Sequence, residues 1–335
     1  MKLENTLKYR SVWMGVAMLW VVLYHTSGTL AGYSFFKNIG YGGVDLCLFA
    51  SGVGCYYSLS KNDNVFEFTK RRLFRIFPTY WCFLPFWFVY AFKAFEMKVP
   101  DVIGNIFGVQ NFTGKGNAFN WYISAILLFY ILAPYLKMLC DKVGSLPKQL
   151  LVIALLFAFS VPFWNSFTYI ITVSRLPIFY IGMVFAKSSK DGVKLGYKNM
   201  IPYTLAMIAG FVLLWVSFEY LSDYRWNNGL YWYPFILITP GLCVCLSFIM
   251  SLLDKSKFTS WIVSLLSLVG KYSFEVYLVH ILIYDSVNYM INNGVLDGEK
   301  IVYALALCAI PFACLLLNYL TKLVTKTLPS IIKGK

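Results

Sequence analysis

The sequence predicts an all-α, polytopic membrane protein whose helices form one bundle. Of its 335 residues, 59% are apolar and only 13% are charged, whereas soluble domains are about half apolar and a quarter charged. Apolar stretches long enough to cross a bilayer as helices, about 17–25 residues each, recur from end to end. Lipid offers no partner to a free backbone amide, so each stretch must be helical. The composition excludes a disordered chain, a soluble Rossmann-type enzyme and a small disulfide-stapled domain.

About ten stretches meet this description, and we predict that they form a single membrane domain over 1–335. No long linker or low-complexity run separates them. The predicted spans are 11–30, 41–59, 76–93, 119–136, 149–165, 168–186, 200–220, 231–252, 271–290 and 301–321.

The basic residues that flank these spans predict their orientation. The chain has 29 Lys and Arg against 15 Asp and Glu, a net charge of +14. If the N-terminus is cytoplasmic, 22 of the 29 basic residues fall in the six segments on that side, and both termini lie there. The positive charge is therefore expected to face anionic lipid headgroups of the bilayer, and no nucleic acid is expected as a partner.

The eight cysteines lie in or beside the apolar spans and show no CxxC spacing. We expect buried thiols and no metal site. These residues are Cys47, Cys55, Cys82, Cys140, Cys243, Cys245, Cys308 and Cys314.

A few ionisable residues fall within or next to the spans, where they are costly and are therefore functional candidates. The chain has only two histidines, and both lie in predicted spans. Glu219 and Asp285 carry no further signal in their neighbourhoods. The full set is His25, Asp45, Arg175, Glu219, Glu275, His280 and Asp285.

His25 lies deep in the first span, roughly 22 Å beyond Arg10 and about 60° from it around the helix. A neutral imidazole is a good general base near pH 7. The alternative, equally supported by composition, is a structural histidine bonded to a neighbouring helix. Asp45 begins the second span at a similar depth and could orient the imidazole, as the acid of a catalytic triad does. It could equally cap the first turn of its own span.

The stretch TKRRLFRIFPTYW places Arg72 and Arg75 three residues apart, on one helix face at the membrane surface. Guanidinium groups can bind the phosphates of a nucleotide-type donor bidentately. The positive-inside rule alone also explains this cluster, and by itself it is the stronger explanation. Pro78 fits the start of the next membrane helix.

Arg175 lies on the side predicted to be outside, where basic residues are scarce. We expect a partner for it, either Asp45 or Glu219, or an anionic group of an acceptor. Glu275 and His280 are about 140° apart around a helix, so they do not face one partner. A packed core role for His280 is slightly favoured over a second catalytic base.

Six segments together resemble the acyltransferase-3 family, integral membrane O-acyltransferases that modify bacterial cell-surface polysaccharides. The resemblance covers nearly the full length and follows the family's order. The segments are VVLYH ending at His25, GYGGVDLCLFASG around Asp45, KRRLFRIFPTYW with Arg72 and Arg75, NWYISAILLFYILAP at 120–134, RLPIFYIGM from Arg175, and VGKYSFEVYLVH ending at His280.

The resemblance implies that His25 is the catalytic histidine and that Arg72 and Arg75 bind cytoplasmic acyl-CoA. It also implies ten helices in the bacterial cytoplasmic membrane. Two departures from the family pattern concern Met14, where many members have an arginine that Arg10 could replace, and Ile126–Leu127, where many have an acidic pair. Some relatives carry a fused hydrolase-like domain, for which 322–335 leave no room.

The expected reaction is acyl transfer, most simply of acetyl from acetyl-CoA as a co-substrate with no bound cofactor, to a carbohydrate hydroxyl. His25 acts as general base or first accepts the acyl group, and Asp45 orients it. Arg175 and His280 are candidates for holding the acceptor or stabilising the oxyanion. Glycan-assembly proteins are expected partners. The main alternative is a transporter or flippase, although no internal repeat is visible.

Overall fold

The computed structural model describes residues 3–26, 35–113, 118–193, 197–221, 228–297 and 300–327. Within these ranges every regular element is a helix, as predicted. The long helices are α2 (Arg10–His25), α5 (Gly43–Lys61), α6 (Val65–Ala94), α9 (Trp121–Lys142), α10 (Leu146–Ala158), α12 (Leu176–Lys190), α13 (Tyr197–Tyr220), α14 (Phe235–Leu253), α15 (Ser260–Lys271), α16 (Ser273–Asn292) and α17 (Lys300–Thr327). The short ones are α1 (Glu4–Leu7), α4 (Phe35–Asn38), η1 (Gly40–Gly42), α7 (Val99–Ile106), α8 (Gln110–Thr113), η2 (Ala118–Asn120), η3 (Val161–Phe163) and α11 (Phe167–Val173).

Every predicted span overlaps one or more of these helices, although residues 27–30 of the first span lie outside the described residues; the count of ten is not confirmed. Among the described residues, six helical segments are long and apolar enough to cross a membrane, or seven if the bent pair α15–α16 is one span. Helices α2, α5 and α6 do not meet these criteria of length and hydropathy. The chain is a multi-pass membrane protein.

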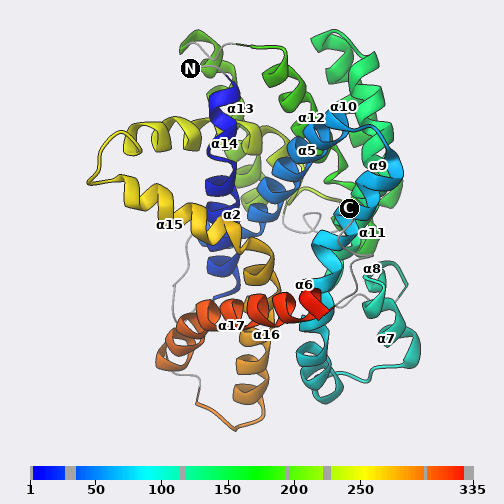
Figure 1. The fold of residues 1–335 in the computed structure, drawn as a ribbon, viewed down its shortest axis with the longest axis vertical. Helices are drawn as coiled ribbons and strands as arrows, with labels where there is room; N and C mark the ends of the chain where they lie inside the picture. Colours follow the sequence, from blue (N-terminus) through cyan, green and yellow to red (C-terminus); the bar gives the residue numbers. More distant parts are fainter. Residues whose placement is uncertain are drawn as a thin grey trace.

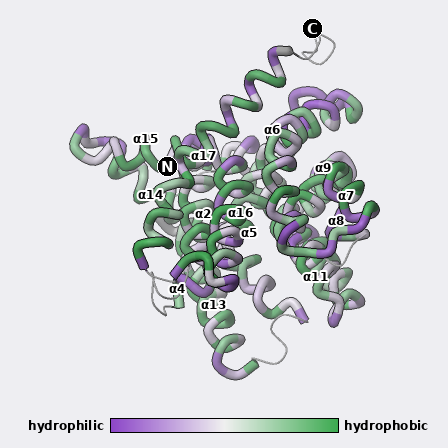
Figure 2. Tube along the Cα trace, turned by 90° about the horizontal axis from the view of Figure 1, so that it is seen from below, coloured by the Kyte–Doolittle hydropathy of each residue, from purple (hydrophilic) through white to green (hydrophobic). Residues whose placement is uncertain are grey.

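Helix α2 lies at the centre of the bundle, where it contacts α5, α15 and α16. Helix α17 crosses α16 and α6 (Figure 1). Seen from below, α15 and the end of α17 project from the remaining helices (Figure 2). The central position of α2 means that residues spaced along it lie at successive depths in the protein interior.

Two glycines allow α2 and α15 to pack at backbone contact. A Cβ added to Gly270 would overlap the backbone oxygen of Ser11, and one added to Gly15 would overlap that of Leu266. Small residues at helix crossings are the usual means of close approach in membranes. This crossing brings the end of α15, and with it Lys271, next to the start of α2.

The chain bends by 71° between α15 and α16, with Tyr272 at the break. The break lies inside the bundle, so the first turn of the 20-residue helix α16 opens into the interior. Helix N-termini present free N–H groups and partial positive charge.

Pro78, which was expected at the start of a membrane helix, lies inside helix α6. The helix begins 13 residues earlier, at Val65, where the Asn64 side chain accepts a hydrogen bond from the Glu67 N–H at 3.0 Å. It continues without a break through Pro78 to Ala94. Prolines are tolerated inside membrane helices because neighbouring groups satisfy the freed carbonyl. Arg72 and Arg75 are therefore placed on a continuous helix and not on a loop.

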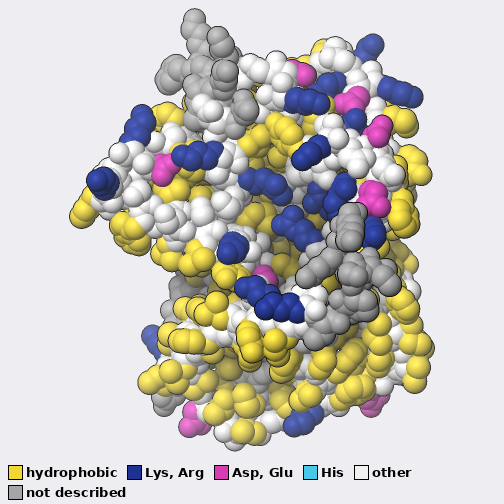
Figure 3. All heavy atoms as spheres, in the orientation of Figure 1, with side chains coloured by type: hydrophobic (Ala, Val, Ile, Leu, Met, Phe, Trp, Pro, Cys, Tyr) yellow, Lys and Arg dark blue, Asp and Glu magenta, His cyan; other side chains and the backbone are white. Residues whose placement is uncertain are grey.

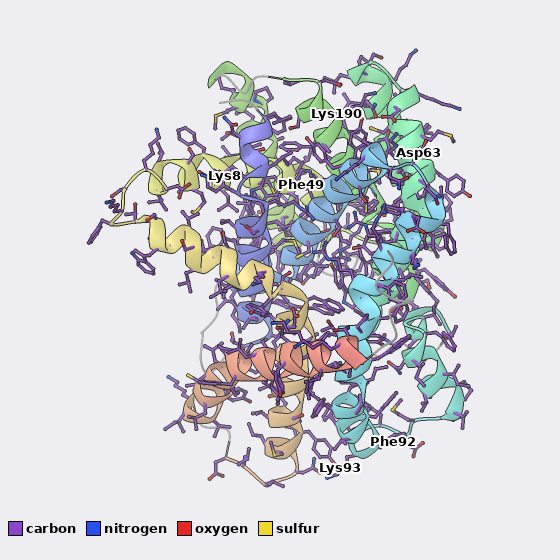
Figure 4. The ribbon with its side chains drawn as sticks, viewed as in Figure 1. Lys8, Phe49, Asp63, Phe92, Lys93 and Lys190 are labelled. Atoms are coloured by element: carbon purple, nitrogen blue, oxygen red, sulfur yellow. The ribbon has the colours of Figure 1, made fainter. Side chains whose placement is uncertain are left out.

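Segments predicted to share the cytoplasmic side do meet at one end. Lys8 forms an ion pair with Asp254 at 2.6 Å, and the Leu3 N–H donates to the Val193 oxygen at 3.0 Å. Lys8, Asp63 and Lys190 lie in the upper part of Figure 4, whereas Lys93 lies at the bottom. The grouping agrees with the predicted topology. The assignment of this end, and of both termini, to the cytoplasm stays a prediction.

Candidate active site

Two cavities of about 410 Å³ each lie along α2 and α16. The first, which we call the basic cavity, is lined from α2 by Arg10, Ser11, Met14 and Met18. The second, the histidine cavity, is lined from α2 by Val21, Tyr24 and His25. The two cavities therefore follow one another along a single helix.

Three cations line the basic cavity: Arg10 of α2, Arg75 of α6 and Lys271 at the end of α15. No acidic side chain is found among the described residues that line it. Nε of Arg10 is buried and has no hydrogen-bond partner. Ser273, at the start of α16, also lines the cavity, so the positive end of a helix dipole adds to these charges. The cavity is electrostatically suited to an anion.

Arg72 lies outside this cavity. Its side chain is buried, its Nη2 donates to the Gly54 oxygen of α5 at 2.8 Å, and its guanidinium lies 5.2 Å and 5.4 Å from the ring centres of Phe68 and Tyr130. Arg75 is exposed on the cavity wall. The structure thus separates the two arginines that the sequence grouped together.

The surface around these elements is also basic. Figure 3 shows Lys and Arg side chains gathered over the middle and upper part of one face, whereas the lower part is mostly hydrophobic. An asymmetric charge distribution of this kind is what a membrane protein with one basic rim presents.

The histidine cavity has walls built mainly of aromatic rings, with three ionisable side chains among them: His25, Arg175 and Asp285. The aromatic lining comes from several helices and loops. It consists of Tyr24, Tyr41, Trp87, Phe95, Phe119, Trp121, Phe167, Trp232 and Tyr277.

The two histidines are in contact. Nε2 of His280 lies 3.3 Å from Nδ1 of His25, with the ring centres 5.0 Å apart. His25, the last residue of α2, is exposed and lines the cavity, whereas His280 is fully buried. Nδ1 of His25 also lies 2.9 Å from the Val21 oxygen, and Nδ1 of His280 lies 2.7 Å from the Val276 oxygen.

Asp45 and Arg175 form a buried ion pair, each only 1% exposed, with 3.2 Å between Asp45 Oδ1 and Arg175 Nε. This confirms one of the two partners predicted for Arg175; the other, Glu219, is exposed. The guanidinium lies between the rings of Trp121 and Trp232, 4.5 Å and 5.0 Å from their centres.

The predicted contact of Asp45 with His25 is wrong in this geometry. The Asp45 carboxylate is directed to Arg175, while the His25 ring is held by Val21 and His280. The physical reason is burial: a fully buried guanidinium requires a counter-charge more than a neutral imidazole does. Glu275, another ionisable residue in a predicted span, accepts a hydrogen bond from the Asn318 side chain at 3.1 Å.

Among the residues that the structure describes, Tyr277 of α16 is the only one that lines both cavities. Its hydroxyl donates to the Phe119 oxygen at 2.5 Å, and its ring centre lies 4.8 Å from that of Tyr122. The phenol therefore forms a common wall between the two cavities.

Two further residues of the site received no role from the sequence: Lys271, and Asp285, which was named only as an ionisable residue in a predicted span. Lys271 was counted only as part of the basic rim, because the break after α15 cannot be read from composition. Asp285 lies four and eight residues after Ile281 and Tyr277, and all three line the histidine cavity. That helical spacing is the signal that could have identified it.

The fold and the site together define a class: a multi-pass helical membrane protein with two histidines in contact at an aromatic cavity, and a basic cavity next to it along the same helix. A family model described as an acyltransferase domain matches residues 13–321. The chain belongs to the acyltransferase-3 family and is a membrane acyltransferase. No curated protein and no solved structure matches the chain.

Proposed function

We propose that the protein transfers an acetyl group from cytoplasmic acetyl-CoA to a hydroxyl of a cell-surface or lipid-linked carbohydrate, in the bacterial cytoplasmic membrane. The observation that supports this most directly is the placement of Arg10 and His25 on one helix, each on the wall of a different cavity. One cavity suits an anionic donor, and the other contains an accessible imidazole.

The donor is assigned from the charges of the basic cavity. Arg10, Arg75 and Lys271 offer three cations and no acid, which suits the phosphates of coenzyme A. Met14 and Met18 line the same cavity on the next turns of α2 and give an apolar path for the acylated arm toward His25. The helical rise makes this path roughly 22 Å long.

The acceptor is assigned from the walls of the histidine cavity. A sugar presents apolar C–H faces, which pack on aromatic rings, and hydroxyl edges, which require hydrogen-bonding groups. The aromatic lining supplies the first, and Arg175 and Asp285 supply the second. Asp285 hydrogen-bonds to no other described residue, so its carboxylate is available to a hydroxyl.

In the proposed reaction the acceptor hydroxyl gives its proton to Nε2 of His25 while its oxygen bonds to the thioester carbonyl carbon. The C–S bond then breaks, the carbonyl re-forms, and the thiolate of coenzyme A takes the proton from His25. Arg175 also lines this cavity, and its positive charge stabilises the oxyanion of the intermediate. If His25 accepts the acyl group first, the same proton balance applies in two steps.

The test is acetyl transfer by the purified protein in lipid bilayers, supplied with isotope-labelled acetyl-CoA and a panel of saccharides. The proposal requires saccharide-dependent release of coenzyme A and label in the saccharide. Movement of saccharide across the bilayer without release of coenzyme A would identify a transporter instead. Transfer from succinyl-CoA in preference to acetyl-CoA would change the donor only.

Arg75→Gln is expected to raise the KM for acetyl-CoA about 10-fold to 100-fold with little change in stability. The substitution removes a charge-assisted hydrogen bond worth about 1.5–3 kcal/mol to a donor phosphate. Initial rates at varied acetyl-CoA, with the melting temperature of each variant, check this.

Two neighbouring arginines serve as controls. Arg71 is exposed and lies outside the basic cavity, so Arg71→Gln should leave the KM within about twofold. Arg72→Gln loses the bond to the Gly54 oxygen and should mainly lower the melting temperature. An unchanged KM in Arg75→Gln would exclude Arg75 from donor binding.

A further inference from the structure

The two histidines make the same local contact. In each ring, Nδ1 lies within hydrogen-bonding distance of the backbone oxygen four residues earlier, Val21 for His25 and Val276 for His280. A carbonyl oxygen can only accept a hydrogen bond, so Nδ1 must carry the proton in both rings. This tautomer is therefore fixed by the backbone of each histidine's own helix.

The same reasoning determines the contact between the rings. A neutral imidazole with a proton on Nδ1 has a bare lone pair on Nε2. Nε2 of His280 therefore accepts a hydrogen bond from the Nδ1–H of His25, across the 3.3 Å that separates these atoms. The Nδ1–H of His25 is shared between this nitrogen and the Val21 oxygen, a three-centre bond.

The remaining nitrogen, Nε2 of His25, is then bare. No described residue hydrogen-bonds this atom, and His25 lines the histidine cavity. We infer that His280 is the positioning residue of His25: its Nε2 holds the Nδ1–H of His25 and so keeps the other nitrogen unprotonated and available to the acceptor hydroxyl. This inference rests on the proposed function of His25.

His280 thus takes the place that the sequence suggested for Asp45, but as a neutral acceptor. When Nε2 of His25 takes the acceptor's proton, its Nδ1–H continues to donate to His280 and to Val21. His280 keeps its own proton on Nδ1 throughout and exchanges none with the substrate. Its complete burial and its bond to the Val276 oxygen fix the ring in one orientation.

Nitrogen NMR tests the tautomers directly, because the chain contains only these two histidines. The probe is the full-length protein in lipid bilayers, labelled with ¹⁵N in its histidine rings, at a pH where both rings are neutral. Both rings should show a protonated Nδ1 and an unprotonated Nε2, with a through-space correlation from His25 Nδ1 to His280 Nε2. A spectrum in which His25 carries its proton on Nε2 would overturn the inference.

A matched pair of variants separates positioning from packing. The amide oxygen of Gln reaches the position of a histidine Nε2, whereas that of Asn reaches only the position of Nδ1. His280→Gln is therefore expected to keep kcat within about threefold, while His280→Asn and His280→Phe lose about 10-fold to 100-fold. The KM for acetyl-CoA should not change in any of them.

The outcomes distinguish this inference from the proposed function. If His280→Asn is as active as His280→Gln, the acceptor role is wrong even if acetyl transfer is confirmed. If the protein transfers no acyl group, the predicted tautomers can still be verified by NMR, and the failure lies with the function. If one variant does not fold, only its kinetic comparison is lost, because the NMR spectrum of the native protein still tests the predicted tautomers.

Discussion

Replacing His25 with alanine is expected to abolish acyl transfer while the protein still folds and inserts. A positioned general base contributes about 10²-fold to 10⁴-fold to a rate, and His280 is not positioned to replace it, since it is fully buried and is not among the described residues that line the histidine cavity. The side chain is exposed at the end of α2, so its loss removes little packing. Turnover of labelled acetyl-CoA and the melting temperature of the variant check both parts.

The matched control for His25→Ala is Glu219→Gln, another change at an ionisable residue in a predicted span. Glu219 is exposed and lies outside both cavities, so this variant should remain active. Native activity in His25→Ala would refute a catalytic role for the histidine and with it the proposed mechanism.

Replacing Asp45 with alanine is expected to destabilise the fold by about 3–5 kcal/mol, because it leaves the buried guanidinium of Arg175 without its counter-charge. The expected observations are a lower yield of folded protein and a lower melting temperature in detergent. The double variant Asp45→Leu/Arg175→Met should recover most of the lost stability, since two apolar residues of similar volume need no ion pair.

These variants also decide between the two roles considered for Asp45. An Asp45→Ala protein that is as stable as the native one but inactive would show that the carboxylate serves the reaction and not Arg175. Recovery of stability in the double variant, with acyl transfer still impaired, is the expected result. Arg175 lines the histidine cavity and its loss should weaken acceptor binding.

The helices could be predicted from sequence because lipid leaves the backbone no other way to satisfy its hydrogen bonds. The number of membrane spans could not be predicted in the same way. Helices α2, α5 and α6 lie outside the length and composition test, and these are the helices that supply His25, Asp45 and Arg75. Helix α2 has 16 residues and is therefore shorter than the 18 that a span requires, although its sequence is strongly apolar.

The sequence indicated which residues belong to the candidate site better than it indicated which of them contact one another. His25 and the Arg175–Asp45 pair could be anticipated because buried charges need partners. Spacing along one helix places Arg72 and Arg75 on one face, but which of them meets the backbone of α5 depends on how α6 packs. The His25–His280 contact joins residues 255 positions apart, and no local pattern encodes it.

The single phenol ring between the two cavities has a physiological implication. A protein that transfers a chemical group across an energised membrane must not also provide a conducting path for protons or other ions. Tyr277 lines both cavities, and the bond from its hydroxyl to the Phe119 oxygen holds the phenol between them. In the proposed reaction the acyl arm has to pass this ring to reach His25, so the position of the ring bears on both acyl transfer and the permeability of the membrane to ions.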